Sequence, residues 1–216
     1  MFQKLHEECG VFGIYAEPGI DVAHAAYYAL FALQHRGQAS CGIAVNDRGV
    51  ITAHKAAGLV NDVFAGDTLA ALGQGRMAVG HVRYGDSVAD DRFNAQPLVI
   101  KHMKGCMALA LNGKLTNGAQ LREELELAGS IFHTTSDAEV ISYIITRERL
   151  RASSVETAVE RAMEKLCGAY TLVLMSPTKL IAVRDPHGFH PLCIGRRGGS
   201  LAVASETCAL ATLGYE

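Results

Sequence analysis

Apolar and polar positions alternate along this chain with two different periods, and each period predicts one type of element. Short apolar runs bounded by Gly, Asn and Asp are typical of strands. They occur at residues 11–15, 42–45, 50–54, 77–83, 98–102, 107–111, 169–175, 180–184, 192–194 and 201–204. Longer segments with apolar residues at roughly every third or fourth position predict helices. These segments are residues 22–34, 118–128, 136–150 and 153–166.

Turn and cap residues mark several of the element boundaries. Residues 46–49, Asn-Asp-Arg-Gly, have the composition of a hairpin turn. Ser136 with Glu139, and Ser153 with Glu156, each match a capping box at the start of a helix. The strands form two groups around central helices, and no repeat or Pro- and Ser-rich linker divides the chain. The pattern therefore predicts one α+β domain whose sheets are covered by helices.

Composition narrows the class of protein further. The 216 residues are 49% hydrophobic and 19% charged, against about 25% charged in an average domain, so the chain can fill a large core. A formal net charge of −2 argues against a nucleic-acid-binding surface. No apolar run approaches the ~18 residues that span a bilayer, and residues 1–8 lack the apolar core of a secretory signal. We expect a globular protein of the cytoplasm.

Six cysteines are scattered along the chain without a CxxC pair, so we expect most of them to be thiols packed as small hydrophobic groups. Cys9 has two interpretations. It can be a buried residue at the start of a strand, or a nucleophile that forms when the Glu8–Cys9 bond is cleaved. Cleavage would give Cys9 a free α-amine with an ordinary pKa of about 7.7–8.0, which could accept the thiol proton.

Other candidate residues each allow a structural and a chemical interpretation. Arg36 and Arg83 can be surface charges, or guanidinium groups that bind a substrate carboxylate. Asn112-Gly113 can be a turn, or an amide beside a backbone N–H in an oxyanion hole. Asp137 can stabilise a helix N-terminus by roughly 0.3–1 kcal/mol, or bind a substrate ammonium group.

Metal binding is disfavoured, and we expect no metal site. His187 and His190 lie in a turn-rich segment rather than on a helix, and neither an HExxH motif nor a cysteine knuckle is present.

The order of these motifs resembles the glutamine amidotransferases of the N-terminal-nucleophile type, and within them the amidophosphoribosyltransferase family. The similarity extends over essentially the whole chain. The motifs are Cys9-Gly-Val-Phe-Gly-Ile14, Leu33-Gln-His-Arg-Gly-Gln38, Gly80-His-Val-Arg-Tyr84, Asn94-Ala-Gln-Pro97, Asn112-Gly113, Thr134-Thr-Ser-Asp137, Arg184-Asp-Pro-His-Gly188 and Ala204-Ser-Glu-Thr-Cys-Ala209.

The resemblance implies a four-layer α-β-β-α sandwich of two antiparallel sheets, and a glutaminase reaction. It implies that residues 1–8 form a propeptide, after which Cys9 attacks the glutamine amide and forms a γ-glutamyl thioester. Asn112 and the Gly113 N–H would stabilise the oxyanion. The family also implies substrate-binding roles for three charged residues: Arg83 at the α-carboxylate, Asp137 at the α-ammonium group, and Arg36 near the nucleophile.

The resemblance also implies that residues 9–216 are the glutaminase domain of a larger enzyme. The phosphoribosyltransferase domain, which would make phosphoribosylamine in the first step of purine synthesis, is absent from this chain. We expect no cofactor here, because magnesium and the iron–sulfur cluster of some members belong to the absent domain. L-Glutamine is the expected substrate, and the full-length enzyme is expected to be a homo-oligomer.

Three positions depart from the family pattern. Asp86 follows Gly85 where hydroxyl-bearing residues are usual, Leu111 replaces a His, and His190 replaces an Arg. A carboxylate near the glutamine carboxylate would repel it. Two alternatives follow: a domain that binds glutamine or regulates without turnover, and the glutaminase domain of another amidotransferase, such as one that aminates a sugar phosphate.

Overall fold

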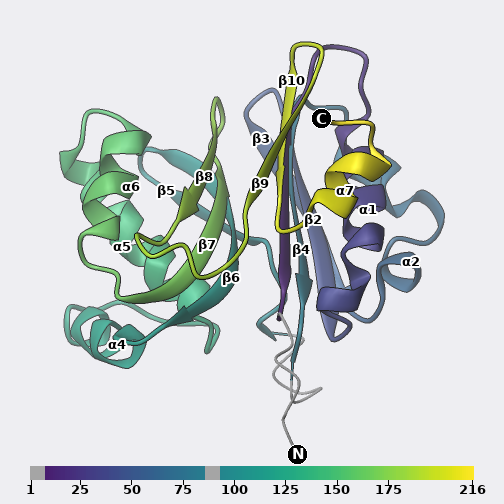
Figure 1. Cartoon of the computed structure of the whole chain (residues 1–216). Coiled ribbons are helices and arrows are strands. Elements are labelled where there is room, and N and C mark those ends of the chain that lie inside the picture. Colours follow the sequence, from purple (N-terminus) through teal and green to yellow (C-terminus); the bar gives the residue numbers. More distant parts are fainter. Residues whose placement is uncertain (1–7, 86–92) are drawn as a thin grey trace, which may run out of the picture.

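A computed structural model describes residues 8–85 and 93–216. Within them, ten strands form two antiparallel sheets (Figure 1). The larger sheet has the order β3-β2-β4-β1-β10-β9 and the smaller one β5-β6-β7-β8. The larger sheet consists of β1 (Gly10–Tyr15), β2 (Ser40–Asp47), β3 (Val50–Ala57), β4 (Met77–Arg83), β9 (Cys193–Arg197) and β10 (Ser200–Ala204). The smaller sheet consists of β5 (Leu98–His102), β6 (Gly105–Leu115), β7 (Gly168–Met175) and β8 (Leu180–Arg184).

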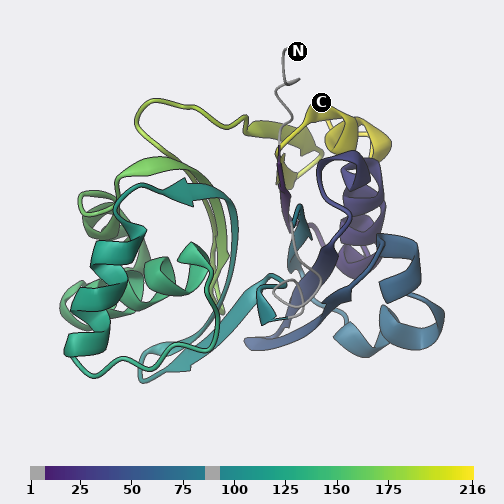
Figure 2. The ribbon, with the colours of Figure 1, turned by 90° about the horizontal axis from the view of Figure 1, so that it is seen from below.

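Helices cover the outer face of each sheet, so the layers run α-β-β-α (Figures 1 and 2). The larger sheet carries α1 (Val22–Ala32), α2 (Val60–Val63) and α7 (Thr207–Thr212). The smaller sheet carries α4 (Gly118–Leu127), α5 (Asp137–Arg151) and α6 (Val155–Met163). Short 3-10 turns lie at Gln34–Arg36, Gly66–Thr68 and Ala70–Leu72. The predicted fold class, α+β with two antiparallel sheets in a four-layer sandwich, is confirmed.

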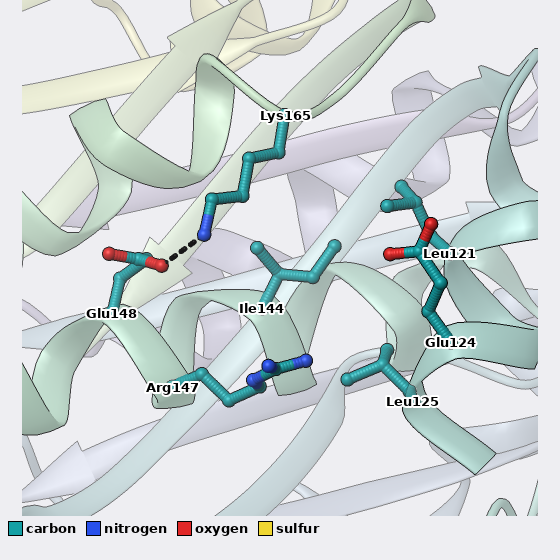
Figure 3. Close-up of a pocket in the computed structure, with 7 residues that line it drawn as sticks. All are labelled: Leu121, Glu124, Leu125, Ile144, Arg147, Glu148 and Lys165. Carbon is teal, nitrogen blue, oxygen red and sulfur yellow. Dashed lines mark hydrogen bonds and ion pairs between the residues drawn. The ribbon is translucent and has the colours of Figure 1, made fainter. Parts of the chain in front are cut away.

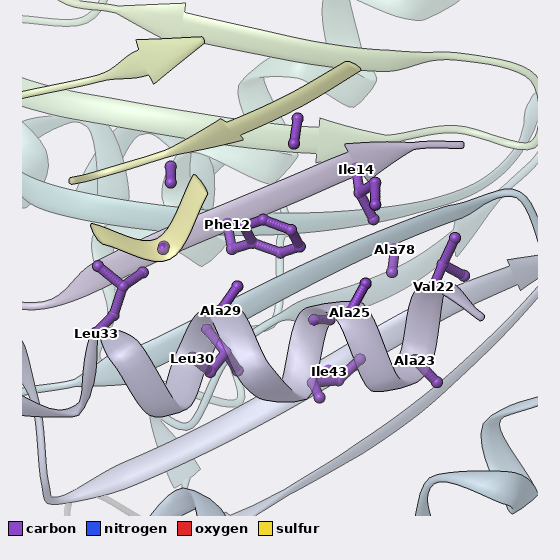
Figure 4. Close-up of a cluster of buried hydrophobic side chains, with 14 of the residues drawn as sticks. Phe12, Ile14, Val22, Ala23, Ala25, Ala29, Leu30, Leu33, Ile43 and Ala78 are labelled. Atoms are coloured by element: carbon purple, nitrogen blue, oxygen red, sulfur yellow. The ribbon is translucent and has the colours of Figure 1, made fainter. Parts of the chain in front are cut away.

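A separate hydrophobic cluster fills each of the three spaces between layers. Phe12 and Leu30 belong to the cluster between the larger sheet and its helices (Figure 4), and Ile141 to the cluster beneath α5. Val11 belongs to the cluster between the two sheets, together with small residues such as Ala110. Because successive side chains of a strand point to opposite faces, neighbouring residues of β1 serve two different cores.

Two buried side chains of the larger sheet donate hydrogen bonds to backbone carbonyls in or next to the strands of the smaller sheet. Asn46 Nδ2 donates to the Ser176 oxygen at 2.9 Å. His81 Nε2 donates to the Leu111 oxygen at 2.9 Å. A buried carbonyl without a partner costs about 1–3 kcal/mol, so these bonds help to specify how the two sheets face each other.

The predicted strands and long helices are all present, with boundaries shifted by a few residues. The hairpin predicted at residues 46–49 joins β2 to β3, with φ of +51° at Arg48 and +92° at Gly49, as the favoured two-residue hairpin turn requires. The largest shift is in β6, which continues to Leu115 instead of ending at residue 111. The prediction missed α2 and α7, which are too short to show a clear period.

The two predicted capping boxes were only partly right. Ser136 is the N-cap of α5, but its side chain accepts from the Ala138 N–H, and Glu139 instead accepts from the backbone of His133 and Thr134. At α6 the cap is Ser154, one residue later than predicted, and it accepts from the Thr157 N–H.

Replacing Leu30 should test the core between α1 and the larger sheet. Leu30 is fully buried and packs closely against Gly80 of β4, so Leu30→Ala should lower the free energy of unfolding by about 2–5 kcal/mol in urea titrations. Leu127→Ala is the matched control, because Leu127 is 84% exposed at the end of α4. That variant should stay within about 0.5 kcal/mol of the parent. Equal losses in both variants would contradict this assignment of the core.

Candidate active site

Cys9 lies immediately before β1, where its backbone is held by Arg36. The Cys9 N–H donates to the Arg36 carbonyl at 2.9 Å, and the Cys9 carbonyl accepts from Arg36 Nε at 2.6 Å. Cys9 has a φ of +62°, in the left-handed region that is uncommon for residues other than glycine. One residue thus fixes both backbone polar groups of Cys9, in a conformation that the free chain rarely adopts.

Arg36 is held in turn by a carboxylate at the start of α7. Its guanidinium is 99% buried, and Nη1 donates to Glu206 Oε1 at 2.7 Å. His35 Nε2 contacts the other oxygen of Glu206 at 3.0 Å. Burial would raise the pKa of Glu206, but the hydrogen bonds and charges of Arg36 and His35 outweigh burial and lower the pKa below its ordinary value.

A cavity of about 390 Å³ opens beside Cys9 at the ends of the two sheets. Five of the six residues predicted from sequence line it, namely Cys9, Arg83, Asn112, Gly113 and Asp137. They come from the start of β1, the end of β4, β6 and the first turn of α5. The other lining residues are Glu8, Tyr84, Gly85, Asn94, Gln96, Leu111, Lys114, Thr135, Ser136 and His190.

The sixth predicted residue, Arg36, is not among the residues that line this cavity. Its guanidinium lies behind Cys9, where it contacts the Cys9 carbonyl and Glu206. The expectation that Arg36 lies near the nucleophile agrees with these contacts. Its grouping with the substrate-binding residues stays a prediction, and the contacts described here are with the protein itself.

Asn112 is a central residue of strand β6, so the interpretation of Asn112-Gly113 as a turn is wrong. It shares a strand face with Ala108 and Ala110, which pack between the two sheets. The Asn112 side chain is 99% buried, yet among the described residues neither Nδ2 nor Oδ1 has a hydrogen-bond partner. A buried amide without a partner is costly in a folded protein, which makes Asn112 a candidate for binding a ligand atom.

One edge of β6 is open beyond Leu109, because β5 pairs only with residues 105–109 of β6. Side chains occupy this edge instead of a strand. The Leu111 N–H donates to Gln96 Oε1 at 2.7 Å, and the Leu115 N–H donates to Asp137 Oδ2 at 2.8 Å. Alternate residues of a strand direct their N–H groups to the same edge. The Gly113 N–H therefore points to this open edge, between two N–H groups that are already occupied.

Gly113 could not be replaced here by another residue without moving the strand. Its φ is +131°, and a Cβ atom would lie 2.1 Å from the Ala169 oxygen of β7. Both facts favour glycine.

The segment before β5 joins the walls of the cavity. Asn94 and Thr135 exchange two hydrogen bonds, of 2.8 and 3.0 Å, which tie this segment to the loop before α5. Glu139, buried in α5, accepts from the N–H groups of His133 and Thr134, and so folds the same loop back onto its helix. Asn94 and Thr135 belong to sequence motifs, but the motifs do not indicate these roles, because the roles depend on contacts across the chain.

The thiol of Cys9 is not activated in this form of the chain. Burial raises its pKa above the ordinary value, and the negative charge of Glu8 acts in the same direction. A hydrogen bond from the Tyr84 backbone and the positive charges of Arg83 and Arg36 offset part of this rise. Because the thiolate is the nucleophile, a base close to Cys9 is needed for reaction near neutral pH.

The other cysteines differ in their surroundings. Cys41 is buried, and burial raises its pKa to about 12, as expected for a thiol packed as a small hydrophobic group. Cys167 and Cys208 are exposed, so for these two residues that expectation was wrong. All six cysteines are free thiols.

A second cavity, of about 230 Å³, lies between α4 and α5 (Figure 3). Glu148 and Lys165 form an ion pair beside it, and Leu121, Leu125 and Ile144 supply apolar surface. None of the residues predicted from sequence lies there. In residues 8–85 and 93–216 no group of three or more His, Cys, Asp or Glu side chains could hold a metal ion. No helix in those same ranges is long and apolar enough to cross a membrane.

Two expectations lie outside the described residues. Asp86, the departure from the family pattern, falls in residues 86–92, and the expected propeptide falls almost entirely in residues 1–7. Leu111, the second departure, is described. It lines the cavity as a buried side chain, and its backbone N–H and carbonyl are both hydrogen-bonded.

The sequence resemblance implied the arrangement found here. In a four-layer sandwich, a cysteine precedes a central strand and lies in one cavity with the buried Asn112 amide and the Gly113 N–H. A family model described as a glutamine amidotransferase domain matches residues 84–212. The chain belongs to this family.

Comparison with individual proteins indicates the branch of the family. The chain is 48% identical over 208 residues to the amidophosphoribosyltransferase of Methanocaldococcus jannaschii, which covers 96% of this chain and 44% of that protein. It is 43% identical over 208 residues to the amidophosphoribosyltransferase of Archaeoglobus fulgidus, with 96% and 45% covered. The solved glutamine phosphoribosylpyrophosphate amidotransferase of Bacillus subtilis, complexed with ADP and GMP, has a TM-score of 0.86 at 40% identity, with 96% and 44% covered.

These comparisons confirm the resemblance to amidophosphoribosyltransferases. The chain spans less than half the length of the curated relatives it matches.

Replacing Glu206 should show how the ion pair with Arg36 supports the site. The pKa of Glu206 is lower in the folded protein than its ordinary value of about 4.5. Its stabilising contribution is therefore present at neutral pH and is lost as the pH falls through the folded-state pKa. Glu206→Gln should lower the free energy of unfolding by roughly 1–3 kcal/mol at pH 7, and the difference from the parent should shrink below about pH 4.5.

The measurement is a series of urea titrations between pH 3 and 7. Glu123→Gln is the control, because Glu123 is an exposed carboxylate on α4, and it should differ from the parent by no more than about 0.5 kcal/mol at any pH. A pH-independent difference for Glu206→Gln would rule out this role of the carboxylate.

Proposed function

We propose that this chain releases ammonia from L-glutamine, with Cys9 as the nucleophile. The observation that carries the proposal is the buried amide of Asn112, which lies in the same cavity as the Cys9 thiol and has no hydrogen-bond partner in the described part of the chain. An oxyanion that forms when a thiolate attacks an amide carbon needs hydrogen-bond donors that are not already engaged. Asn112 Nδ2 and the Gly113 N–H meet this requirement.

Processing would supply the base. Removal of residues 1–8 turns the Cys9 N–H into an α-amine, whose ordinary pKa of about 7.7–8.0 suits proton transfer near neutral pH. The Arg36 carbonyl, which accepts from the Cys9 N–H at 2.9 Å, would hold that amine by one hydrogen and orient its lone pair. Processing also removes the carboxylate of Glu8, one of the causes that raise the pKa of the thiol.

The reaction then proceeds in two steps. The Cys9 sulfur attacks the amide carbon of glutamine, while the α-amine takes the thiol proton and passes it to the leaving nitrogen. Ammonia departs and a γ-glutamyl thioester remains. Water, deprotonated by the same amine, attacks the thioester carbon. The carbon–sulfur bond breaks, the amine returns the proton to the Cys9 sulfur, and glutamate leaves.

A positive and a negative side chain that line the cavity suit the α-amino acid end of glutamine. The guanidinium of Arg83, at the end of β4, would bind the α-carboxylate by paired hydrogen bonds. The carboxylate of Asp137 would bind the α-ammonium group. Its Oδ2 already accepts from the Leu115 N–H at 2.8 Å, which fixes the side chain at the cavity wall.

We further propose that residues 9–216 act as the glutaminase half of an amidophosphoribosyltransferase. Relatives with that name are about twice as long as this chain, and a related structure is described as an allosteric regulatory enzyme of purine biosynthesis. The remaining half would bind phosphoribosyl pyrophosphate with magnesium and use the ammonia to make phosphoribosylamine. The homo-oligomer and, in some members, an iron–sulfur cluster would belong to that complete enzyme.

We place the reaction in the cytoplasm. The proposed nucleophile must stay a reduced thiol, and the six free cysteines suit a compartment that keeps thiols reduced.

Cys9 should be essential for glutamate release from glutamine. Cys9→Ala should reduce kcat by at least about 10⁴-fold, because the covalent step is lost. Cys167→Ala is the matched control, since Cys167 is exposed and does not line the cavity, and it should retain full activity. Glutamine binding by calorimetry without ammonia release from the processed parent would instead favour a glutamine-binding domain without turnover.

The mass of the intact protein should report processing. An active sample should begin at Cys9, having lost residues 1–8, and a sample that retains Met1 should hydrolyse glutamine very poorly, because Cys9 then has an amide instead of an amine. Mass spectrometry and the glutaminase assay on the same sample make the comparison. Full activity with Met1 attached would refute the role of the α-amine.

A further inference from the structure

His81 is a fully buried histidine whose contact the proposed reaction does not use. It lies on β4 between β1 and β2, opposite Val11 and Gly42, and faces the smaller sheet. Its Nε2 donates to the Leu111 carbonyl at 2.9 Å. Among the described residues, Nδ1 has no hydrogen-bond partner. This single bond therefore orients the ring.

Leu111 is held on both of its backbone polar groups by side chains. His81 occupies the carbonyl at 2.9 Å, and Gln96 Oε1 occupies the N–H at 2.7 Å. On the rest of this sheet edge, strand β5 provides those bonds, but β5 ends opposite Leu109. The two side chains thus continue the ladder for one more residue, and the next two residues along β6 are Asn112 and Gly113.

The backbone of Gln96 packs closely against the larger sheet. A Cβ atom on Gly42 of β2 would lie 2.3 Å from the Gln96 carbonyl, so the segment rests directly on the strand. Lys55 Nζ donates to the Ala95 carbonyl at 2.6 Å. His81 and Gln96, which hold Leu111, are therefore both anchored to the larger sheet, and Cys9 lies immediately before β1 of that sheet.

We propose that His81 is a positioning residue for glutamine cleavage: through the Leu111 carbonyl, it sets the place of the Asn112 and Gly113 donors relative to Cys9. This inference rests on the function proposed above. The donors belong to the smaller sheet and the nucleophile to the larger one. Catalysis therefore needs the two sheets to be held at a fixed distance and orientation where they line the cavity. The His81–Leu111 bond links the two sheets one residue away from the donors.

The chemistry of the ring suits this role. Burial, together with the nearby charges of Arg83 and Lys55, lowers the pKa of His81 to about 3, although the bond to Leu111 acts in the opposite direction. The imidazole is therefore neutral throughout the working pH range, with its one ring proton on Nε2. A neutral donor holds the carbonyl without burying a cation between the two sheets.

Loss of the His81–Leu111 bond is expected to lower kcat and to leave KM unchanged. Arg83 and Asp137 would bind glutamine in the ground state, and neither belongs to β6. The oxyanion exists only after attack, so misplaced donors weaken the transition state alone. A displacement of about 1 Å at a reacting group can cost roughly 100-fold in rate.

The test uses the processed protein and two replacements of similar shape. His81→Met removes the donor, and we expect kcat for glutamate release to fall about 10- to 100-fold with KM for glutamine unchanged within about twofold. His81→Gln can place an N–H near the position of Nε2, and should recover most of kcat. Gln96→Met, which removes the acceptor on the other side of Leu111, should give the same split between kcat and KM, and it serves if His81→Met does not fold.

Asn46→Ala is the matched control. It removes the bond from Asn46 Nδ2 to the Ser176 carbonyl and the bond that Asn46 Oδ1 accepts from the Gly49 N–H, and neither bond is next to a proposed donor. It should reduce stability about as much as His81→Met in urea titrations and leave kcat unchanged. An unchanged kcat in His81→Met, a change in KM alone, or an equal loss of kcat in Asn46→Ala would overturn the proposal. The parent is measured in the same assay: if it shows no Cys9-dependent turnover, the proposed function fails, whereas equal kcat values in the parent and His81→Met refute only the role of His81.

Discussion

The open edge of strand β6 is the constraint on which the candidate site depends. The N–H and carbonyl groups at a strand edge inside a protein must have hydrogen-bond partners, which can be other protein groups or a bound ligand. Here β5 stops opposite Leu109, and side chains of Gln96, His81 and Asp137 satisfy the groups on either side of Gly113. The one N–H between them is directed at the cavity. The hydrogen-bond pattern of the sheet thus creates a donor that no side chain needs to supply.

The second half of the site is built on the backbone of Cys9 rather than on its side chain. Arg36 binds both the N–H and the carbonyl of Cys9, and Glu206 holds Arg36. A buried guanidinium is tolerated only when it is paired, and here the pairing partner comes from the far end of the chain. This explains why the motif at residues 33–38 and the motif at residues 204–209 belong to one function although neither contributes a wall of the cavity.

Most of the fold could be predicted from the sequence, and part of the site could be. Strand and helix periods located nearly every element, because each is decided by local alternation of apolar residues. The missed helices, α2 and α7, are too short for a period. At α5 the N-cap Ser136 was predicted correctly, but Glu139 does not complete a capping box, because it binds an upstream loop instead of its own helix end. Five site residues were placed in one cavity as the motifs implied. The contacts of Arg36 with Cys9 and Glu206 could not be predicted, since a charge that binds backbone looks the same in sequence as one that binds substrate.

The sequence by itself determined the α+β class, the alternation of faces along each strand and the family to which the chain belongs, since these depend on residue type, spacing and order. Only the tertiary structure decided that Asn112 and Gly113 lie within strand β6, where one edge is open, and do not form a turn. It also decided that Arg36 binds the backbone of Cys9, and that His81 and Gln96 bind the backbone of Leu111, the residue before Asn112. Each of these facts depends on where an unrelated strand ends or which distant group lies within hydrogen-bond reach. Local sequence cannot predict these contacts between distant residues, because they form only when the two sheets pack against each other.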